Sequence, residues 1–106
     1  MALAQQCIRE ALEIGVELRA FMPVIYGLPT AALLLAERGA LERAVEVYAC
    51  ASRYAFVANS RCFEDLVGRP VAAVAALLSA ELVEAARERG QALEWDVMAA
   101  ELLGEL

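Results

Sequence analysis

Residues 19–51 read RAFMPVIYGLPTAALLLAERGALERAVEVYACA, and the rest of this 106-residue chain is organised around them. Positions 20–36 hold no charged side chain, as expected for a helix that is covered on nearly every side. Gly39 marks a turn, and an amphipathic helix follows it, with Arg43 and Glu46 on its polar side. The segment therefore predicts two helices that pack side by side, with the uncharged one as the central rod of the domain.

Four residues of this segment have a spacing that is typical of tetratricopeptide-like helical hairpins. Gly39 ends the first helix, and Ala44 and Ala51 are small enough to let the second helix approach the first closely. Tyr48 lies between the two alanines in the sequence and fills the gap beside them. The spacing predicts an all-α fold of antiparallel helical hairpins, arranged as a fragment of an α-solenoid.

The same gaps of four and three residues occur forty positions earlier, at Ala4, Ile8 and Ala11. They predict that residues 1–19 form the second helix of a truncated repeat, without the first helix that should cover it. Residues 20–53 then form a complete hairpin and residues 54–106 form C-terminal capping helices, all within one helical-repeat domain.

Start and stop signals place the remaining elements. The predicted helices are 2–18, 22–38, 40–53, 59–67, 70–78, 80–89 and 94–103. Pro29 should kink the second of these, or divide it into two short helices. Gly68 and Gly90 are expected to end helices, Ser79 to cap one, and residues 54–58 to form an extended connector.

Composition argues against several classes of function. The net charge is −6, and the nine basic residues, all arginine, are scattered among fifteen acids, which disfavours direct binding to nucleic acid or to an anionic membrane. The uncharged run is short for a membrane span and contains prolines. No basic leader segment follows Met1, and Cys7, Cys50 and Cys62 are expected to be buried thiols, so we expect a cytoplasmic protein.

No catalytic constellation is present in the sequence, which has no histidine. Glu64 and Asp65 are adjacent carboxylates, but neighbouring helical residues point about 100° apart, so the pair is better explained by favourable charge at a helix start. We therefore expect no enzymatic activity and neither a cofactor nor a metal.

Two segments, LLLAERGALERAVEVYACASR (33–53) and LSAELVEAARERGQALEWDVMAAELL (78–103), resemble the C-terminal helical-repeat region of bacterial signalling (STAND-type) ATPases and LuxR-type transcriptional regulators related to the maltose regulator. The resemblance extends over nearly the whole chain. It implies a sensor or interaction platform that binds a partner protein or a small inducer and passes that state to an ATPase. Residues 22–38 lack the tryptophan–leucine–glycine signature of standard tetratricopeptide first helices, so the predicted fold is tetratricopeptide-like with the subfamily open. The chain also lacks a GxxxxGK(S/T) phosphate loop and a basic recognition helix, so hydrolysis and DNA binding do not transfer to it.

Two functions of different classes follow from these patterns. The first is a protein-interaction or self-assembly module whose uncovered first helix docks onto another repeat, a protein partner or a second copy; Tyr54, Phe56 and Arg61 then form a partner edge, or the two aromatics simply seal the end of the repeat. The alternative is a sensor with an inducer groove lined by Tyr26, Tyr48 and Tyr54. Trp95 is expected to pack in the core.

Overall fold

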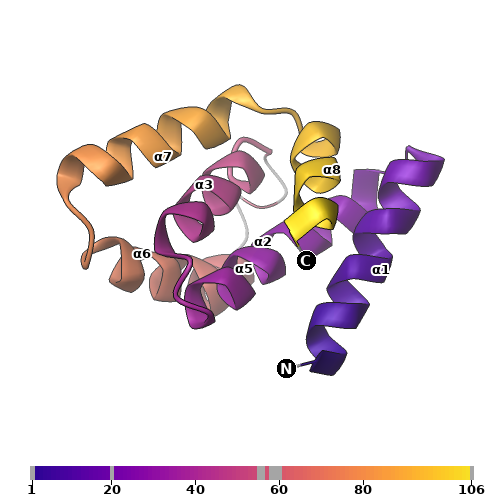
Figure 1. The fold of residues 1–106 in the computed structure, drawn as a ribbon, viewed down its shortest axis with the longest axis horizontal. Coiled ribbons are helices and arrows are strands. Elements are labelled where there is room, and N and C mark those ends of the chain that lie inside the picture. The colour runs from indigo at the N-terminus through magenta and orange to yellow at the C-terminus, as the bar shows by residue number, and fades with distance from the viewer. Residues whose placement is uncertain (1, 20, 55–56, 58–60, 106) are drawn as a thin grey trace.

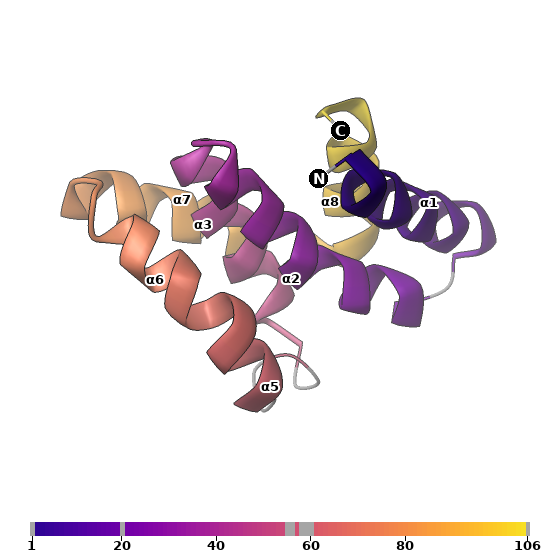
Figure 2. The same ribbon diagram turned by 90° about the horizontal axis from the view of Figure 1, so that it is seen from below.

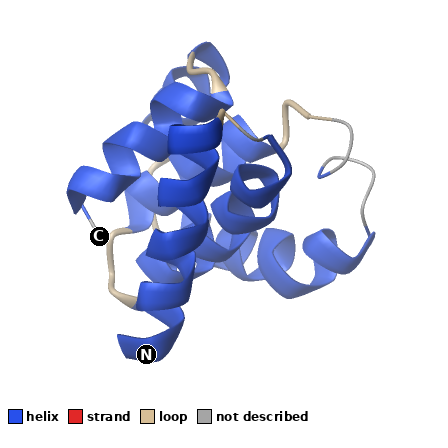
Figure 3. Ribbon diagram, turned by 90° about the vertical axis from the view of Figure 1, so that its right-hand side faces the viewer, coloured by secondary structure: helices blue, strands red, loops and turns tan. Residues whose placement is uncertain are grey.

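The computed structural model describes residues 2–19, 21–54, 57 and 61–105, apart from the side chains of residues 2–4, 21–23, 25, 26 and 63. Every element in these ranges is helical, which confirms the all-α prediction (Figure 3). The elements in chain order are α1 (Ala2–Leu18), α2 (Phe21–Glu37), α3 (Leu41–Ala51), α5 (Arg61–Phe63), the π-helical turn η1 (Glu64–Gly68), α6 (Arg69–Ala75), α7 (Ala80–Ala92) and α8 (Trp95–Glu105) (Figure 1).

The uncharged helix α2 lies at the centre of the fold, as predicted. It contacts α1, α3, η1, α6 and α8, and its residues Val24, Leu28, Ala31 and Ala32 have no exposed surface. Pro29 lies inside this one helix, so the alternative of two short helices is wrong. Because proline has no amide proton, the helix lacks one backbone hydrogen bond at this point. None of the described helices is both long and apolar enough to cross a membrane.

The turn between α2 and α3 is closed by the left-handed conformation of Gly39, whose φ is 85°. The amide of Ala40 donates to the carbonyl oxygen of Leu35 at 2.9 Å, and the amide of Gly39 donates to that of Ala36 at 3.1 Å. Both bonds satisfy carbonyl groups at the end of α2, which is the usual role of a glycine in this position. The prediction of a glycine-marked turn is confirmed.

Gly68 and Gly90 do not end helices, contrary to the prediction. The backbone at Gly68 is right-handed helical (φ −56°, ψ −47°), and the chain continues from η1 into α6, which ends at Ala75. Gly90 lies within α7, which runs on to Ala92. The cap at Ser79 is confirmed, because its side chain accepts a hydrogen bond of 3.3 Å from the amide of Leu82.

The connector after α3 is not extended where it is described. Val57 has a helical conformation, and its amide donates to the carbonyl oxygen of Tyr54 at 3.0 Å. The rest of this expectation concerns residues 55, 56 and 58, which lie outside the described part of the chain.

The C-terminal helix α8 returns to the N-terminal helix α1 and packs against both α1 and α2 (Figures 1 and 2). The guanidinium group of Arg9 donates to the carbonyl oxygen of Leu103 at 2.6 Å, and Arg19 forms an ion pair of 3.3 Å with Asp96. The expectation that α1 has no covering helix is therefore wrong for one of its sides, which α8 covers.

Candidate functional site

The predicted repeat positions on α1 and α3 whose side chains are described are buried or half-buried. Ala44 and Ala51 of α3 have no exposed surface, and Tyr48 between them is half-buried. On α1, Ile8 is buried and Ala11 is half-buried. The side chain of Ala4 lies outside the described part of the structure. These residues are part of the packing of the domain and carry no chemistry of their own.

Tyr54, one of the candidates for the partner edge, joins the end of α3 to the start of α8. Its hydroxyl oxygen accepts a hydrogen bond of 3.0 Å from the amide of Trp95 and lies 3.3 Å from a carboxylate oxygen of Glu94. Trp95 is half-buried against the core, as expected. Arg61 is exposed on α5, while Phe56 and the side chain of Tyr26 lie outside the description. The interpretation of Tyr54 as a residue that seals the repeat is the one that the geometry favours.

The loop between α7 and α8 is held by Cys50, whose thiol donates to the carbonyl oxygen of Leu93 at 3.3 Å. Arg53 donates to the same oxygen. Burial raises the pKa of the Cys50 thiol from 9.0 to about 11. Cys7 and Cys62 are exposed, so the prediction of buried thiols is right for Cys50 alone.

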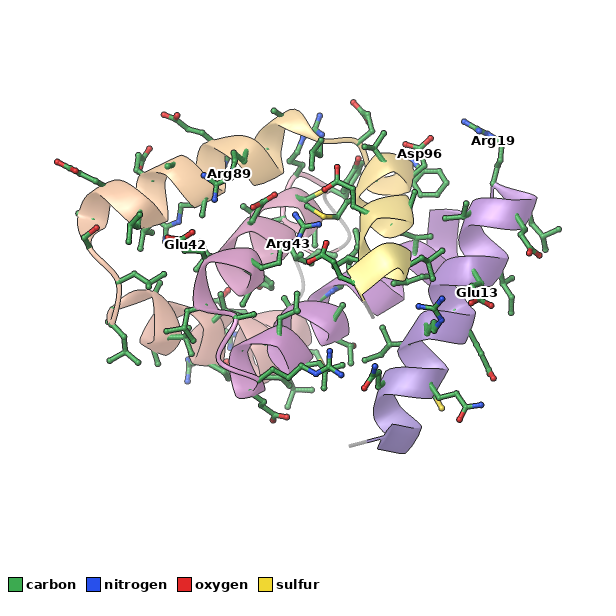
Figure 4. The ribbon with its side chains drawn as sticks, in the orientation of Figure 1. Glu13, Arg19, Glu42, Arg43, Arg89 and Asp96 are labelled. Carbon is green, nitrogen blue, oxygen red and sulfur yellow. The ribbon has the colours of Figure 1, made fainter. Side chains whose placement is uncertain are left out.

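Glu46 is a buried carboxylate with only 8% of its surface exposed, although the sequence placed it on the polar side of its helix. It forms ion pairs with Arg43 of α3 at 2.6 Å and with Arg89 of α7 at 3.2 Å. Arg43 also bonds to Glu101 and Glu105 of α8. Figure 4 shows Arg43 and Arg89 on α3 and α7. Burial lowers the pKa of Arg43, but its bonds to Glu105 and Glu101 and the charge of Glu46 outweigh this and raise it. The network joins the three helices α3, α7 and α8.

The outer face of α1 carries an apolar stripe, which we call the outer stripe; it is formed by the exposed residues Cys7, Ile14 and Leu18 and the half-buried Ala11. Their spacing of four, three and four residues puts them on one side of the helix. Ile14 is 49% exposed and Leu18 is 72% exposed, whereas Leu12, about a third of a turn away, has no exposed surface. The apolar sector of α1 is thus wider than the part that α2 and α8 cover.

A second candidate is a hollow of about 290 Å³ between α3, η1, α6 and α7, which we call the α3–α7 hollow. It is lined by Val45, Tyr48, Ala49, Ser52, Glu64, Gly68, Val71, Ala72, Ala75, Arg87 and Gln91. Burial and then the charge of Glu64 raise the pKa of the Tyr48 hydroxyl, and its hydrogen bond with Ser52 lowers it. The predicted groove of three tyrosines is not found in the described residues, because Tyr48 faces this hollow and Tyr54 bonds to α8.

Sequence reasoning missed the α3–α7 hollow because Gly68 looked like a helix stop and Glu64 like a residue at a helix start. No sequence signal marks a π-helical turn, which differs from an α-helical one only in its hydrogen bonds. Within the described residues, no three cysteine, aspartate or glutamate side chains gather as metal ligands. Comparisons of the chain with models of known protein families, with curated protein sequences and with solved structures gave no match.

Proposed function

We propose that this chain is a non-enzymatic, tetratricopeptide-like module for protein–protein interaction, serving as the sensor or interaction segment of a cytoplasmic bacterial signalling ATPase or transcriptional regulator. The hairpin of α2 and α3, with buried alanines at the predicted positions, supports the architecture. The resemblance described above supports the regulatory context. In this proposal the scaffold presents a helix face to another protein and performs no chemistry.

The observation that carries the proposal is the outer stripe of α1. Full burial of a leucine or isoleucine side chain stabilises by about 1.5–3 kcal/mol relative to exposure. Ile14 and Leu18 are four residues apart and are 49% and 72% exposed, so the domain alone does not gain the full stabilisation from burying them. A helix that laid its own apolar residues along the stripe would gain it, in the helix-to-helix mode by which repeats stack.

The charges beside the stripe indicate the kind of helix that fits. Glu10 and Glu17 are exposed and adjoin Ile14, four residues before it and three residues after it. A second copy of the chain would bring the same acids, and a net charge of −6, against this face. A partner helix with an apolar centre and a lysine- or arginine-rich edge complements it better, whether from a separate protein or from a neighbouring repeat.

Photo-crosslinking from the stripe tests this proposal. A benzoylphenylalanine placed at Leu18 in the full-length protein of the native cells should join a defined partner segment, whereas the same residue at Leu77 of the opposite end, which is 76% exposed, should not. The crosslinked peptide, identified by mass spectrometry, should be amphipathic with a basic edge. Crosslinking that is equal from both positions would contradict a dedicated docking face.

A second candidate function, the sensing of a small molecule, is favoured by the α3–α7 hollow. Pockets for drug-sized ligands measure about 300–1,000 Å³. The hollow lies just below this range at about 290 Å³, and it combines apolar walls with several polar groups. A thermal-shift screen of metabolites tests this function, and the absence of any stabilising compound would count against it.

A further inference from the structure

The α3–α7 hollow brings a carboxylate and a guanidinium group to one cavity without pairing them. Glu64 of η1 and Arg87 of α7 both line it, and neither forms an ion pair with another residue in the described ranges. Most other arginines of the described chain have an acidic partner, among them Arg9, Arg43 and Arg89. Opposite charges that face one cavity and lie too far apart to pair directly suit a ligand that carries both charges itself.

The rest of the lining limits the size and nature of such a ligand. Gln91 is four residues after Arg87 on α7, so the two side chains lie on the same face of that helix and can share one carboxylate. Val45, Val71 and three alanines form the apolar part of the lining. With about 290 Å³ available, the ligand has to be small, with a short apolar group.

Gly68 leaves space for the acidic group of Glu64. A Cβ atom on Gly68 would lie 2.6 Å from a carboxylate oxygen of Glu64 and 2.7 Å from the hydroxyl oxygen of Tyr48. Both oxygens therefore occupy space that only glycine leaves open, and they lie close to each other. Two polar oxygens beside one position provide acceptors for an ammonium group, and π-helical turns recur at functional sites.

We propose that the α3–α7 hollow binds a free α-amino acid with an aliphatic side chain, with its ammonium group on Glu64 and Tyr48 and its carboxylate on Arg87 and Gln91. The aliphatic side chain then lies against Val45 and Val71. This inference rests on the sensing function and is independent of the outer stripe of α1. Glu64 and Arg87 are exposed, so water competes with the ligand for both charged groups and the affinity should be modest. We expect a dissociation constant of roughly 0.1–1 mM.

The test is a calorimetric or NMR titration of the full chain with leucine, N-acetyl-leucine and leucinamide. N-acetylation removes the ammonium charge and amidation removes the carboxylate charge. Each analogue should bind at least ~10-fold more weakly than leucine, since a charge-assisted bond is lost. Equal binding of leucine and N-acetyl-leucine would overturn the proposed role of Glu64. If no amino acid binds at a concentration of about 10 mM, which is 10-fold above the upper end of the expected dissociation constant, the site itself is wrong.

Variants locate the binding within the hollow. Glu64→Gln and Arg87→Gln should each weaken leucine binding at least ~10-fold, and Glu64→Gln should leave the affinity for N-acetyl-leucine unchanged. Gly68→Ala should also weaken binding, because its added methyl group displaces both oxygens from their positions, while a helical circular dichroism signal shows that the variant is folded. The matched controls Glu88→Gln and Arg61→Gln, both exposed and outside the hollow, should bind like the parent. Leucine binding that none of the three variants weakens would overturn the proposal.

The outcome separates this inference from the sensing function itself. If a different metabolite binds and Gly68→Ala weakens its binding, the hollow is a sensor site and the amino-acid assignment is wrong. If no metabolite of any class stabilises the protein, both the assignment and the sensing function are wrong, and the outer stripe of α1 is unaffected.

Discussion

The carbonyl oxygen of Glu46 lies 2.1 Å from the point that a Cβ atom on Gly90 would occupy. Helices α3 and α7 are in extensive contact, and this missing side chain is what lets their backbones approach so closely. The approach also covers Glu46, which is why its carboxylate is buried and needs both Arg43 and Arg89. One glycine therefore determines the spacing of two helices and the environment of the charge between them.

We predict that Gly90→Ala destabilises the protein, although alanine favours helix by roughly 0.5–1 kcal/mol over glycine. The added methyl group would meet backbone atoms, which cannot move away cheaply, so we expect a net loss of about 1–3 kcal/mol. Urea denaturation followed by circular dichroism measures it. Gly104→Ala in α8 is the matched control, since its added carbon meets nothing within 4 Å beyond its chain neighbours and its own helix backbone, and it should stabilise. A stabilising Gly90→Ala would contradict the close approach of the helices.

We predict that Glu46→Gln destabilises by about 1–3 kcal/mol, because a buried carboxylate that accepts bonds from two arginines is replaced by a neutral amide. Glu42→Gln, an exposed change on the same helix, should alter the unfolding free energy by less than about 0.5 kcal/mol. Urea denaturation of both variants provides the comparison. Equal effects would mean that Glu46 is solvated like a surface residue.

Stability should fall as the pH rises from about 9 to about 11. The Cys50 thiol has its pKa raised from 9.0 to about 11 by burial, so the folded state keeps a proton that the unfolded state has lost. A raised pKa gives stability that is complete below pH 9 and is lost as the pH passes about 11. The loss due to Cys50 is about 2–3 kcal/mol at 1.36 kcal/mol per unit.

Urea denaturation between pH 8 and pH 11 tests this dependence, with Cys50→Ala as the comparison. The variant should lose less stability than the parent between pH 9 and pH 10. Above that range both proteins should decline further, because burial also raises the pKa values of Tyr48 and Tyr54. Identical curves for parent and variant would show that Cys50 ionises as a solvated thiol.

Thiol labelling of the native protein should modify Cys7 and Cys62 and leave Cys50 intact. Cys7 and Cys62 are exposed, whereas Cys50 is buried, donates to Leu93 and has little thiolate near neutral pH. Mass spectrometry after iodoacetamide treatment, with and without urea, should count two labels in the folded state and three in the unfolded state. Rapid labelling of Cys50 without urea would contradict the packing of the loop between α7 and α8.

A glycine in a helical pattern can end the helix or allow a close contact with another helix, and only the first of these roles can be read from the local sequence. The end of α2 was predictable, because Gly39 follows a helical pattern and adopts the positive φ that glycine favours. Gly90 gives the same signal in the sequence but serves a contact with α3, 41 or more residues away, that no local pattern contains. What distinguishes the two glycines is the atom that faces them, and that depends on the tertiary fold.

The sites follow the same division. The helical spacing of Cys7, Ala11, Ile14 and Leu18 is visible in the sequence, but which apolar face of α1 stays exposed depends on the return of α8, fixed by contacts such as that between Arg9 and Leu103. The α3–α7 hollow depends on the π-helical turn that carries Glu64 and on the placement of α7. Burial of Cys50 and exposure of Cys62 likewise follow from neighbours that are distant in the chain.

The central claim is that the outer stripe of α1 docks a helix of another protein or repeat. Its most direct test is the dissociation constant of the purified partner for the parent, Leu18→Glu and Leu77→Glu. Leu18→Glu would place a charge in an apolar contact, and this should reduce the binding free energy by as much as removing a hot-spot residue. We therefore expect Leu18→Glu to weaken binding by at least ~30-fold, with an unchanged unfolding free energy. Leu77→Glu should bind like the parent. Affinities within about threefold of each other for all three proteins would contradict the claim.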